Sequence, residues 1–272
     1  MYSYILCGLK VVSDLAFPEL TPWDGPTDDS FDIEFRLGPV EPLWDPAEKG
    51  VHFRASGRDK IIFHIENRGR VLIESGARVV FDAFPGIDGD RLRIEFIGTT
   101  QAMLWYQRGY LPLHASALLV DGRAISIGAR SHNGKSVLAA ALNKRGLPLV
   151  ADDMMVIDVS GEAPLVLPGY QKLRLWKDAC EQLELTGDAV AKALPAQEKF
   201  VLATIGAPAC TPVPLTDIFV LSGLRQEELI AEQLAPVQAF QYLLAATHWL
   251  DAANAMDRQS RSSRASIRSW PV

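Results

Sequence analysis

The sequence predicts a mixed α/β (α+β) chain, and two contrasting patterns along it carry that prediction. Residues 1–97 hold short alternating apolar runs separated by turn residues, which is typical of a small β-rich domain. Residues 98–256 change to a strand, strand, helix, strand order, which favours an α/β domain with a mixed sheet. Residues 257–272 contain four arginines and one aspartate among serines, a net charge of +3, and are typical of a solvated basic tail.

The composition excludes several classes of protein. Of 272 residues, 27 are Lys or Arg and 33 are Asp or Glu, a net charge of −6, and 48% are hydrophobic. This is a globular composition, and its mild acidity argues against nucleic acid as a partner. No apolar run reaches the roughly 18 residues of a membrane-spanning helix, so we expect no membrane partner. Three distant cysteines and a start without a basic signal region favour a cytoplasmic location.

The β-rich part is expected to be a meander of hairpins. Its clearest run, residues 31–37, alternates apolar and charged side chains, as a half-buried antiparallel strand does. Turn residues separate the further strands that we expect at 60–66, 70–74, 78–84 and 91–96. We find no catalytic constellation in this part of the chain. A short helix over 100–108 is expected to follow it.

A β-hairpin is expected to open the second part. Two apolar runs, residues 113–120 and 123–128, flank Asp121-Gly122, which is the signal of a two-residue type I′ turn. Counting outward from this turn pairs His114 with Ala129 across the hairpin. A histidine is thereby expected beside the first residue of the segment that follows the hairpin.

The hairpin leads into a helix and a further strand. Helical spacing over 136–145 is followed by Gly146, a helix-stop signal, and by a buried strand at 147–151. This order predicts a right-handed βαβ crossover, which brings the carboxyl ends of its two strands to the same edge of the sheet. Further along we expect an apolar run at 165–176, a helix at 178–186, a strand at 217–222 and an amphipathic helix from 237 to about 256.

The segment between hairpin and helix fits a relaxed Walker A pattern, with alanine in place of the first glycine. In such loops consecutive backbone N–H groups and a helix N-terminus cradle phosphate oxygens. The lysine neutralises charge on the β- and γ-phosphates, and the serine hydroxyl binds Mg²⁺. The sequence therefore predicts ATP and Mg²⁺ as ligands, held by Ala129, Arg130, Ser131, His132, Asn133, Gly134, Lys135 and Ser136.

Two acidic residues, Asp152 and Asp153, end the strand after the loop helix. A carboxylate at this edge can bind Mg²⁺ or accept a proton from an attacking hydroxyl. Successive strand residues point to opposite faces, so both reach the site only if the chain turns there, and a single functional aspartate remains the alternative. A loop, a metal carboxylate, a base and His114 together favour an enzyme that phosphorylates a hydroxyl, because a plain NTPase needs only the first two.

Three segments give the chain a family resemblance. Leu113-His114-Ala115-Ser116-Ala117, the Walker A-like loop and Leu149-Val150-Ala151-Asp152-Asp153 resemble the C-terminal domain of HPr serine kinase and its relatives, which include lasso-peptide tailoring kinases. Residues 169–176 add to the resemblance. It implies a phosphoenolpyruvate-carboxykinase-like P-loop core that uses ATP and Mg²⁺ to phosphorylate a serine in a small protein or precursor peptide.

The resemblance also implies roles for individual residues. Lys135 and Ser136 match the phosphate and metal positions. Asp152 matches the proton-accepting aspartate, with His114 orienting it, and Asp153 lies near the metal. Arg174 is a candidate for binding phosphate or substrate.

The chain departs from the family pattern in ways that bear on activity. Bifunctional HPr kinase/phosphorylases commonly have Glu after the Gly-Lys-Ser/Thr triplet, where this chain has Val137, and their later glycine-rich signature is not evident. We therefore expect neither phosphorylase activity nor HPr as the substrate. Because Ala129 and His132 make the loop irregular, a nucleotide-binding sensor or scaffold that recognises a peptide remains an alternative, as does a simple NTPase. Relatives assemble, so a homo-oligomer is also expected.

Overall fold

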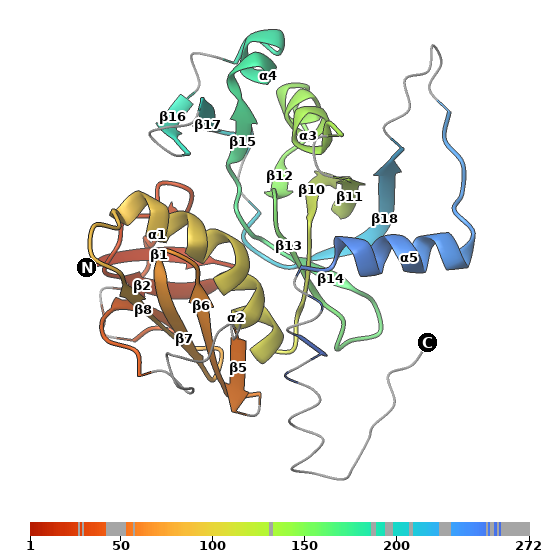
Figure 1. The fold of residues 1–272 in the computed structure, drawn as a ribbon. Coiled ribbons are helices and arrows are strands. Elements are labelled where there is room, and N and C mark those ends of the chain that lie inside the picture. The colour runs from red at the N-terminus through yellow and green to blue at the C-terminus, as the bar shows by residue number, and fades with distance from the viewer. Residues whose placement is uncertain are drawn as a thin grey trace.

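The computed structural model is a mixed α/β structure in which a β-rich unit packs beside an α/β unit (Figure 1). The first unit carries the helices α1 and α2, and the second carries α3, α4 and α5. The structure describes residues 1–26, 28, 30–41, 53–56, 58–130, 133–185, 189–193, 198–206, 209–222, 230–248, 250, 253–254 and 256. The predicted basic tail, 257–272, and the loop residues Ser131 and His132 lie outside the described residues.

The first unit is built on one eight-stranded sheet. Its order is β3-β1-β2-β4-β8-β7-β6-β5. The last four strands form the antiparallel meander that the turn residues predict. In chain order the strands are β1 (Tyr2–Leu6), β2 (Leu9–Ser13), β3 (Thr21–Pro22), β4 (Ile33–Leu37), β5 (Phe53–Ser56), β6 (Lys60–Ile65), β7 (Gly69–Glu74) and β8 (Arg78–Ala83).

Strand β4 corrects the prediction of an antiparallel strand at 31–37. It lies between β2 and β8 and pairs parallel to both. Alternation does place Ile33 and Phe35 in the core, where both are fully buried. The alternation of a strand decides which face each side chain takes, but it carries no information on the direction of the neighbouring strands.

The predicted strand at 91–96 is also wrong, because the chain there forms helix α1 (Gly89–Glu95). The side chain of Asp88 caps the helix by accepting a hydrogen bond of 2.8 Å from the N–H of Arg91. An aspartate at the N-cap accepts a hydrogen bond from a backbone N–H of the first helical turn. This cap stabilises a helix here, although the alternation of apolar residues also fits a strand. The chain continues through η1 (Phe96–Thr100), which is kinked at Gly98, into α2 (Gln101–Gln107), close to the helix expected at 100–108.

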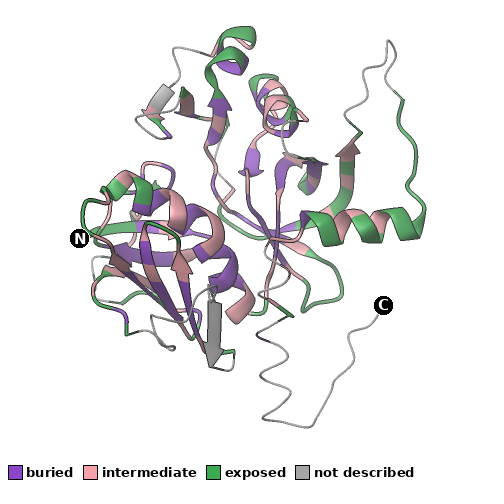
Figure 2. Cartoon of the chain, viewed as in Figure 1, coloured by how far each residue is buried: buried purple, intermediate pink, exposed green. Residues whose placement is uncertain are grey.

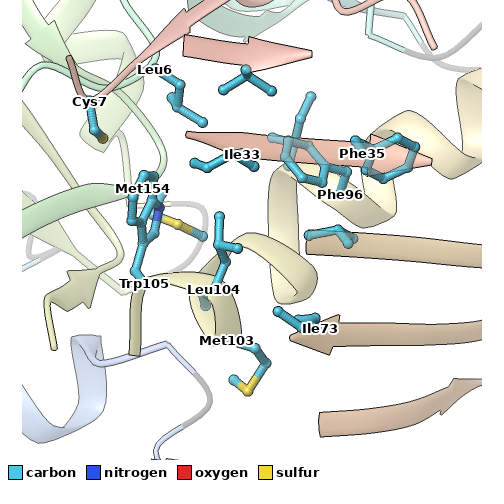
Figure 3. Close-up of a cluster of buried hydrophobic side chains, with 14 of the residues drawn as sticks. Leu6, Cys7, Ile33, Phe35, Ile73, Phe96, Met103, Leu104, Trp105 and Met154 are labelled. Atoms are coloured by element: carbon cyan, nitrogen blue, oxygen red, sulfur yellow. The ribbon is translucent and has the colours of Figure 1, made fainter. Parts of the chain in front are cut away.

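The helices and the first sheet share a core with part of the second unit. Figure 3 shows Met154 beside Trp105, among side chains from β1, β4, β7 and α2. The residues of α2, which the sequence assigns to the second domain, pack in this first core. The predicted boundary between 97 and 98 therefore falls at the kink at Gly98, between two helices that both contribute to this core.

The second unit contains a seven-stranded sheet. Its order is β12-β10-β11-β18-β14-β13-β9, and helix α3 (Lys135–Lys144) packs against β10 and β11. The strands are β9 (Leu111–Leu113), β10 (Ala115–Val120), β11 (Arg123–Ala129), β12 (Leu149–Ala151), β13 (Met155–Asp158), β14 (Leu165–Leu167) and β18 (Val213–Leu221). The last strand was expected at 217–222 and begins four residues earlier.

The predicted hairpin forms with its predicted register. Asp121 and Gly122 have φ values of 48° and 76°, as a type I′ turn requires. The ladder runs from the turn to the pair Ala115↔Gly128. His114 lies beyond its end, in the break between β9 and β10, where its N–H donates to the carbonyl of Ala246 (2.7 Å).

The crossover from β11 through α3 to β12 also forms, with one difference from the simplest arrangement. Strand β10 lies between β11 and β12 and pairs antiparallel with each, so the two crossover strands are parallel without being neighbours. Their carboxyl ends still lie at the same edge of the sheet, as predicted.

The remaining elements are three strands of a separate sheet and two helices. They are β15 (Leu173–Trp176), α4 (Lys177–Gln182), β16 (Ala189–Lys192), β17 (Lys199–Leu202) and α5 (Pro236–Ala246). The run expected at 165–176 is two strands, β14 and β15, which belong to different sheets. Helix α5 ends ten residues before the predicted 256 and exposes much of its surface (Figure 2). Among the described residues, no helix combines the length and apolarity that crossing a membrane requires.

Candidate active site

The predicted phosphate loop connects β11 to α3. Gly134, the residue before the helix, has a φ of +83°, and no atom lies within 4 Å of the position of a Cβ there. This backbone conformation favours glycine, and the open space leaves the helix N-terminus accessible. Lys135 begins α3, so its side chain projects from the first turn of the helix.

Lys135, Ser136 and Asp152 form a polar cluster at the start of the helix, and Lys135 and Asp152 are buried. The lysine ammonium lies 3.5 Å from Oδ1 of Asp152, and the Ser136 hydroxyl donates to the same oxygen at 3.3 Å. Ser116 of β10 also donates to Oδ1, at 2.5 Å. The Asp152 side chain is only 1% exposed, so its charge is balanced within the protein by these donors.

Asp153 turns away from this cluster and faces the open part of the site. Its φ of +67° is left-handed, so the chain bends directly after β12. Its Oδ1 lies 3.3 Å from Nε2 of His114, and its Oδ2 lies 2.9 Å from Nη2 of Arg174. The bend thus lets two successive aspartates both reach the site. The sequence alone leaves open whether the chain turns at this point.

The two aspartates have partners other than those expected from the resemblance. His114 pairs with Asp153, and no ion pair joins it to Asp152, although both belong to the described residues. Ser136, the expected metal residue, hydrogen-bonds Asp152 rather than Asp153. The left-handed bend explains the exchange: the first carboxylate stays under the loop helix, and the second is directed toward the break at His114.

Most of the predicted residues line one cavity of about 430 Å³. Asp152 lies beneath its floor, and Ala129 faces a neighbouring cavity of about 630 Å³ beside α5, which His114 and Arg130 also line. The predicted residues in the first cavity are His114, Arg130, Asn133, Gly134, Lys135, Ser136, Asp153 and Arg174.

The charges in the cavity favour an anion. Burial raises the pKa of the Asp153 carboxyl, but the hydrogen bond to His114 and the charges of Arg174 and Lys135 outweigh it and hold the pKa well below its usual value. Asp153 is therefore ionised at neutral pH. The Nε and Nη1 atoms of Arg174 are buried without a hydrogen-bond partner, so this guanidinium has donors left for a ligand. Buried unpaired donors are rare, and a phosphate oxygen would satisfy them.

The fit to Mg²⁺ can be examined on the same residues. No group of three or more His, Cys, Asp or Glu side chains in the described parts of the chain could hold a metal ion. Ser136 and Asp152 do offer two oxygen atoms 3.3 Å apart at the start of α3, the first lining the cavity and the second beneath it. Mg²⁺ usually takes one or two protein oxygens and completes its shell with water and phosphate, so this pair fits a nucleotide-bound Mg²⁺.

Two residues of the site were missed by the sequence interpretation. Ser116 is a fully buried hydroxyl on β10 that holds Asp152, and a lone polar residue inside an apolar run is the signal that marks it. His248 follows α5 and lies against His114, with ring centroids 5.4 Å apart. No local pattern marks His248, because its position depends on where α5 ends.

Comparison with known proteins finds likeness in structure and none in sequence. No family model matches the chain, and no curated protein matches it in sequence. Among solved structures, the chain is similar to the HPr(Ser) kinase/phosphatase of Coxiella burnetii, with 20% identity and a TM-score of 0.24. The match covers 41% of this chain and 86% of that protein. A likeness of this size does not establish a shared family.

Proposed function

We propose that the protein is an ATP-dependent kinase that transfers the γ-phosphate to a serine hydroxyl of a small protein or peptide. The observation that carries the proposal is that two adjacent carboxylates have different partners. Asp152 lies with the lysine and serine of the phosphate loop, and Asp153 lies in the open cavity with His114 and Arg174. An NTPase needs only the first group, whereas transfer to a hydroxyl also needs a base beside the acceptor.

Each group has a proposed role in the transfer. The loop amides and Lys135 bind the β- and γ-phosphates, and the spare donors of Arg174 contact the γ-phosphate. Ser136 and Asp152 would hold Mg²⁺, which supplies charge neutralisation when bound. The resemblance implies that Asp152 is the base and that Asp153 lies near the metal. We propose the reverse, because Asp152 contacts Ser136, whereas Asp153 contacts His114 and Arg174.

The acceptor side is proposed to be served by Asp153. The serine oxygen forms a bond to the γ-phosphorus, the bond from that phosphorus to the β–γ bridging oxygen breaks, and ADP leaves. The serine proton passes to the carboxylate of Asp153, which its low pKa keeps ionised at neutral pH. His114 and Arg174 fix both carboxylate oxygens, so the base is oriented before the acceptor arrives.

The surroundings of His114 support a macromolecular acceptor. The second cavity, beside α5, shares His114 and Arg130 with the first cavity, so a peptide bound there would lie against the histidine that contacts Asp153. Membership of the HPr kinase-like family and a phosphoenolpyruvate-carboxykinase-like P-loop core are part of this proposal. They are supported by the three sequence segments above, which form β10, the loop with α3, and β12.

The proposal is tested by incubating the protein with γ-labelled ATP, Mg²⁺ and an arrayed library of serine-containing peptides that includes any encoded beside its gene. Label on a peptide serine is the expected result. ATP binding without transfer or hydrolysis would support the sensor instead. Phosphate release at the same rate with and without peptide would support a simple NTPase, and either of these results contradicts the kinase.

A further inference from the structure

Trp176 stands out as a large aromatic side chain that the proposed chemistry does not use. It ends β15, 43% of its surface is exposed, and it lines the same cavity as the phosphate loop. By contrast Trp105, in the first core, is fully buried. A tryptophan left exposed in a ligand cavity is a candidate contact for a flat ligand group.

The position of Trp176 on β15 orients it relative to the reacting end. Side chains two residues apart on a strand share a face, so Trp176 lies on the same face as Arg174, about 7 Å further along. Arg174 contacts Asp153 at the reacting end of the cavity. The indole is therefore displaced along the cavity, away from the acceptor carboxylate.

The lining of the cavity also differs between its two ends. Lys135, Arg174 and Asp153 lie at the reacting end, whereas Trp176 is flanked in sequence by the lining residues Leu175, Asp178 and Ala179. A nucleotide likewise has charged phosphates at one end and an aromatic base at the other. The proposed acceptor would instead bind in the cavity beside α5, which His114 also lines.

Lys199 adds a positive charge at the indole end. It is the cross-strand partner of Trp176 on β17, and its ammonium lies 5.7 Å from the centre of the indole ring. Burial lowers the pKa of Lys199, and the charge of Arg174 lowers it further. The charges of Asp153 and Asp152 act in the opposite direction, and a nucleotide phosphate beside the ammonium would likewise stabilise its charge.

We propose that Trp176 is the base-binding residue of the nucleotide site and stacks on the purine ring of ATP, while Lys199 contacts the adjoining sugar-phosphate. This inference rests on the nucleotide-binding part of the proposed function. It assigns a ligand group to a part of the cavity that the phosphate loop does not reach. Stacking of this kind typically changes affinity by about tenfold or more on replacement by alanine.

The test compares ATP with inorganic tripolyphosphate, which has the phosphates without the base. Affinities of both are measured by calorimetry for the whole protein and for Trp176→Ala and Trp176→Phe. We expect Trp176→Ala to weaken ATP binding by about tenfold or more and to leave tripolyphosphate binding unchanged, and Trp176→Phe to keep most of the ATP affinity. ATP should also quench a tryptophan emission that is missing in Trp176→Phe.

A matched control comes from the first unit of the chain. Trp23 also has a lysine ammonium over its ring, that of Lys10 at 5.5 Å, but it does not line the cavity. Trp23→Ala should bind ATP as the wild type does. Equal ATP affinity of Trp176→Ala and wild type would overturn the inference, as would an equal loss for ATP and tripolyphosphate. ATP binding that depends on Trp176 without any transfer would leave the inference standing and contradict the kinase.

Discussion

Replacing Asp153 by asparagine separates the proposed base from the phosphate site. Asparagine has nearly the same size, so the cavity keeps its shape, but the residue can no longer take a proton or carry charge opposite His114 (3.3 Å) and Arg174 (2.9 Å). General-base catalysis typically contributes about 10²- to 10⁴-fold, which corresponds to about 3–5 kcal/mol of the barrier. We expect transfer to fall by that factor. ATP affinity should change little, because Lys135, Ser136 and Asp152 keep their contacts.

The assay is a single-turnover transfer from γ-labelled ATP to a peptide that the wild type phosphorylates, with ATP affinity measured by calorimetry. Asp152→Asn is the informative comparison, because loss of its charge beside Ser136 should weaken Mg²⁺-dependent ATP binding. Asp158→Asn, at the end of β13 and outside the cavity, controls for the loss of one carboxylate and should transfer normally. Transfer by Asp153→Asn within tenfold of the wild type would refute the assignment of the base.

Three further predictions concern packing, capping and pH. In Gly128→Ala the new Cβ would lie 1.5 Å from the hydroxyl oxygen of Tyr242, so the free energy of unfolding should fall by about 1–3 kcal/mol and recover in part when Tyr242→Ala is added. Asp88→Ala removes the acceptor for the N–H of Arg91 and should lower the free energy of unfolding by about 1 kcal/mol, measured by urea titration. Burial lowers the pKa of His248, and its neighbour His114 lowers it further, so below about pH 6.5 the unfolded chain binds a proton that the folded chain does not. Stability should therefore be complete above that pH and decline as the pH falls toward the lowered pKa. Urea midpoints measured across this range should decline less steeply in His248→Gln, and an identical decline would contradict the prediction.

The parts of the fold that the sequence predicts well are those set by local chemistry. The hairpin register follows from Asp121-Gly122 alone, because a two-residue turn leaves one pairing. The direction of β4 could not be predicted, since its neighbours β2 and β8 are chosen by the course of the whole chain. The segment at 91–96 fits either an alternating strand or a capped helix, and the burial of its apolar residues against the first sheet accompanies the helix.

The residues of the site were easier to predict than their pairing. The loop, the two aspartates and His114 each carry a local signal, and the βαβ order predicts that they meet at one edge. Which aspartate meets His114 depends on one backbone angle, the φ of +67° at Asp153, which a non-glycine residue rarely adopts. It also depends on the break between β9 and β10. Counting from the hairpin turn places His114 in the ladder opposite Ala129, but in the structure His114 lies in this break.

The alanine that replaces the first loop glycine bears on whether the loop can still hold phosphate. Glycine is required where φ is positive or where another group approaches the backbone closely. Gly134 has a positive φ, of +83°, and Gly128 is closely approached by Tyr242. The chain has glycine at both of these positions. Ala129 lies between them on β11, paired with Leu221, and has no positive φ. A methyl group is compatible with that conformation, so the replacement does not count against phosphate binding and lends no support to a non-catalytic role.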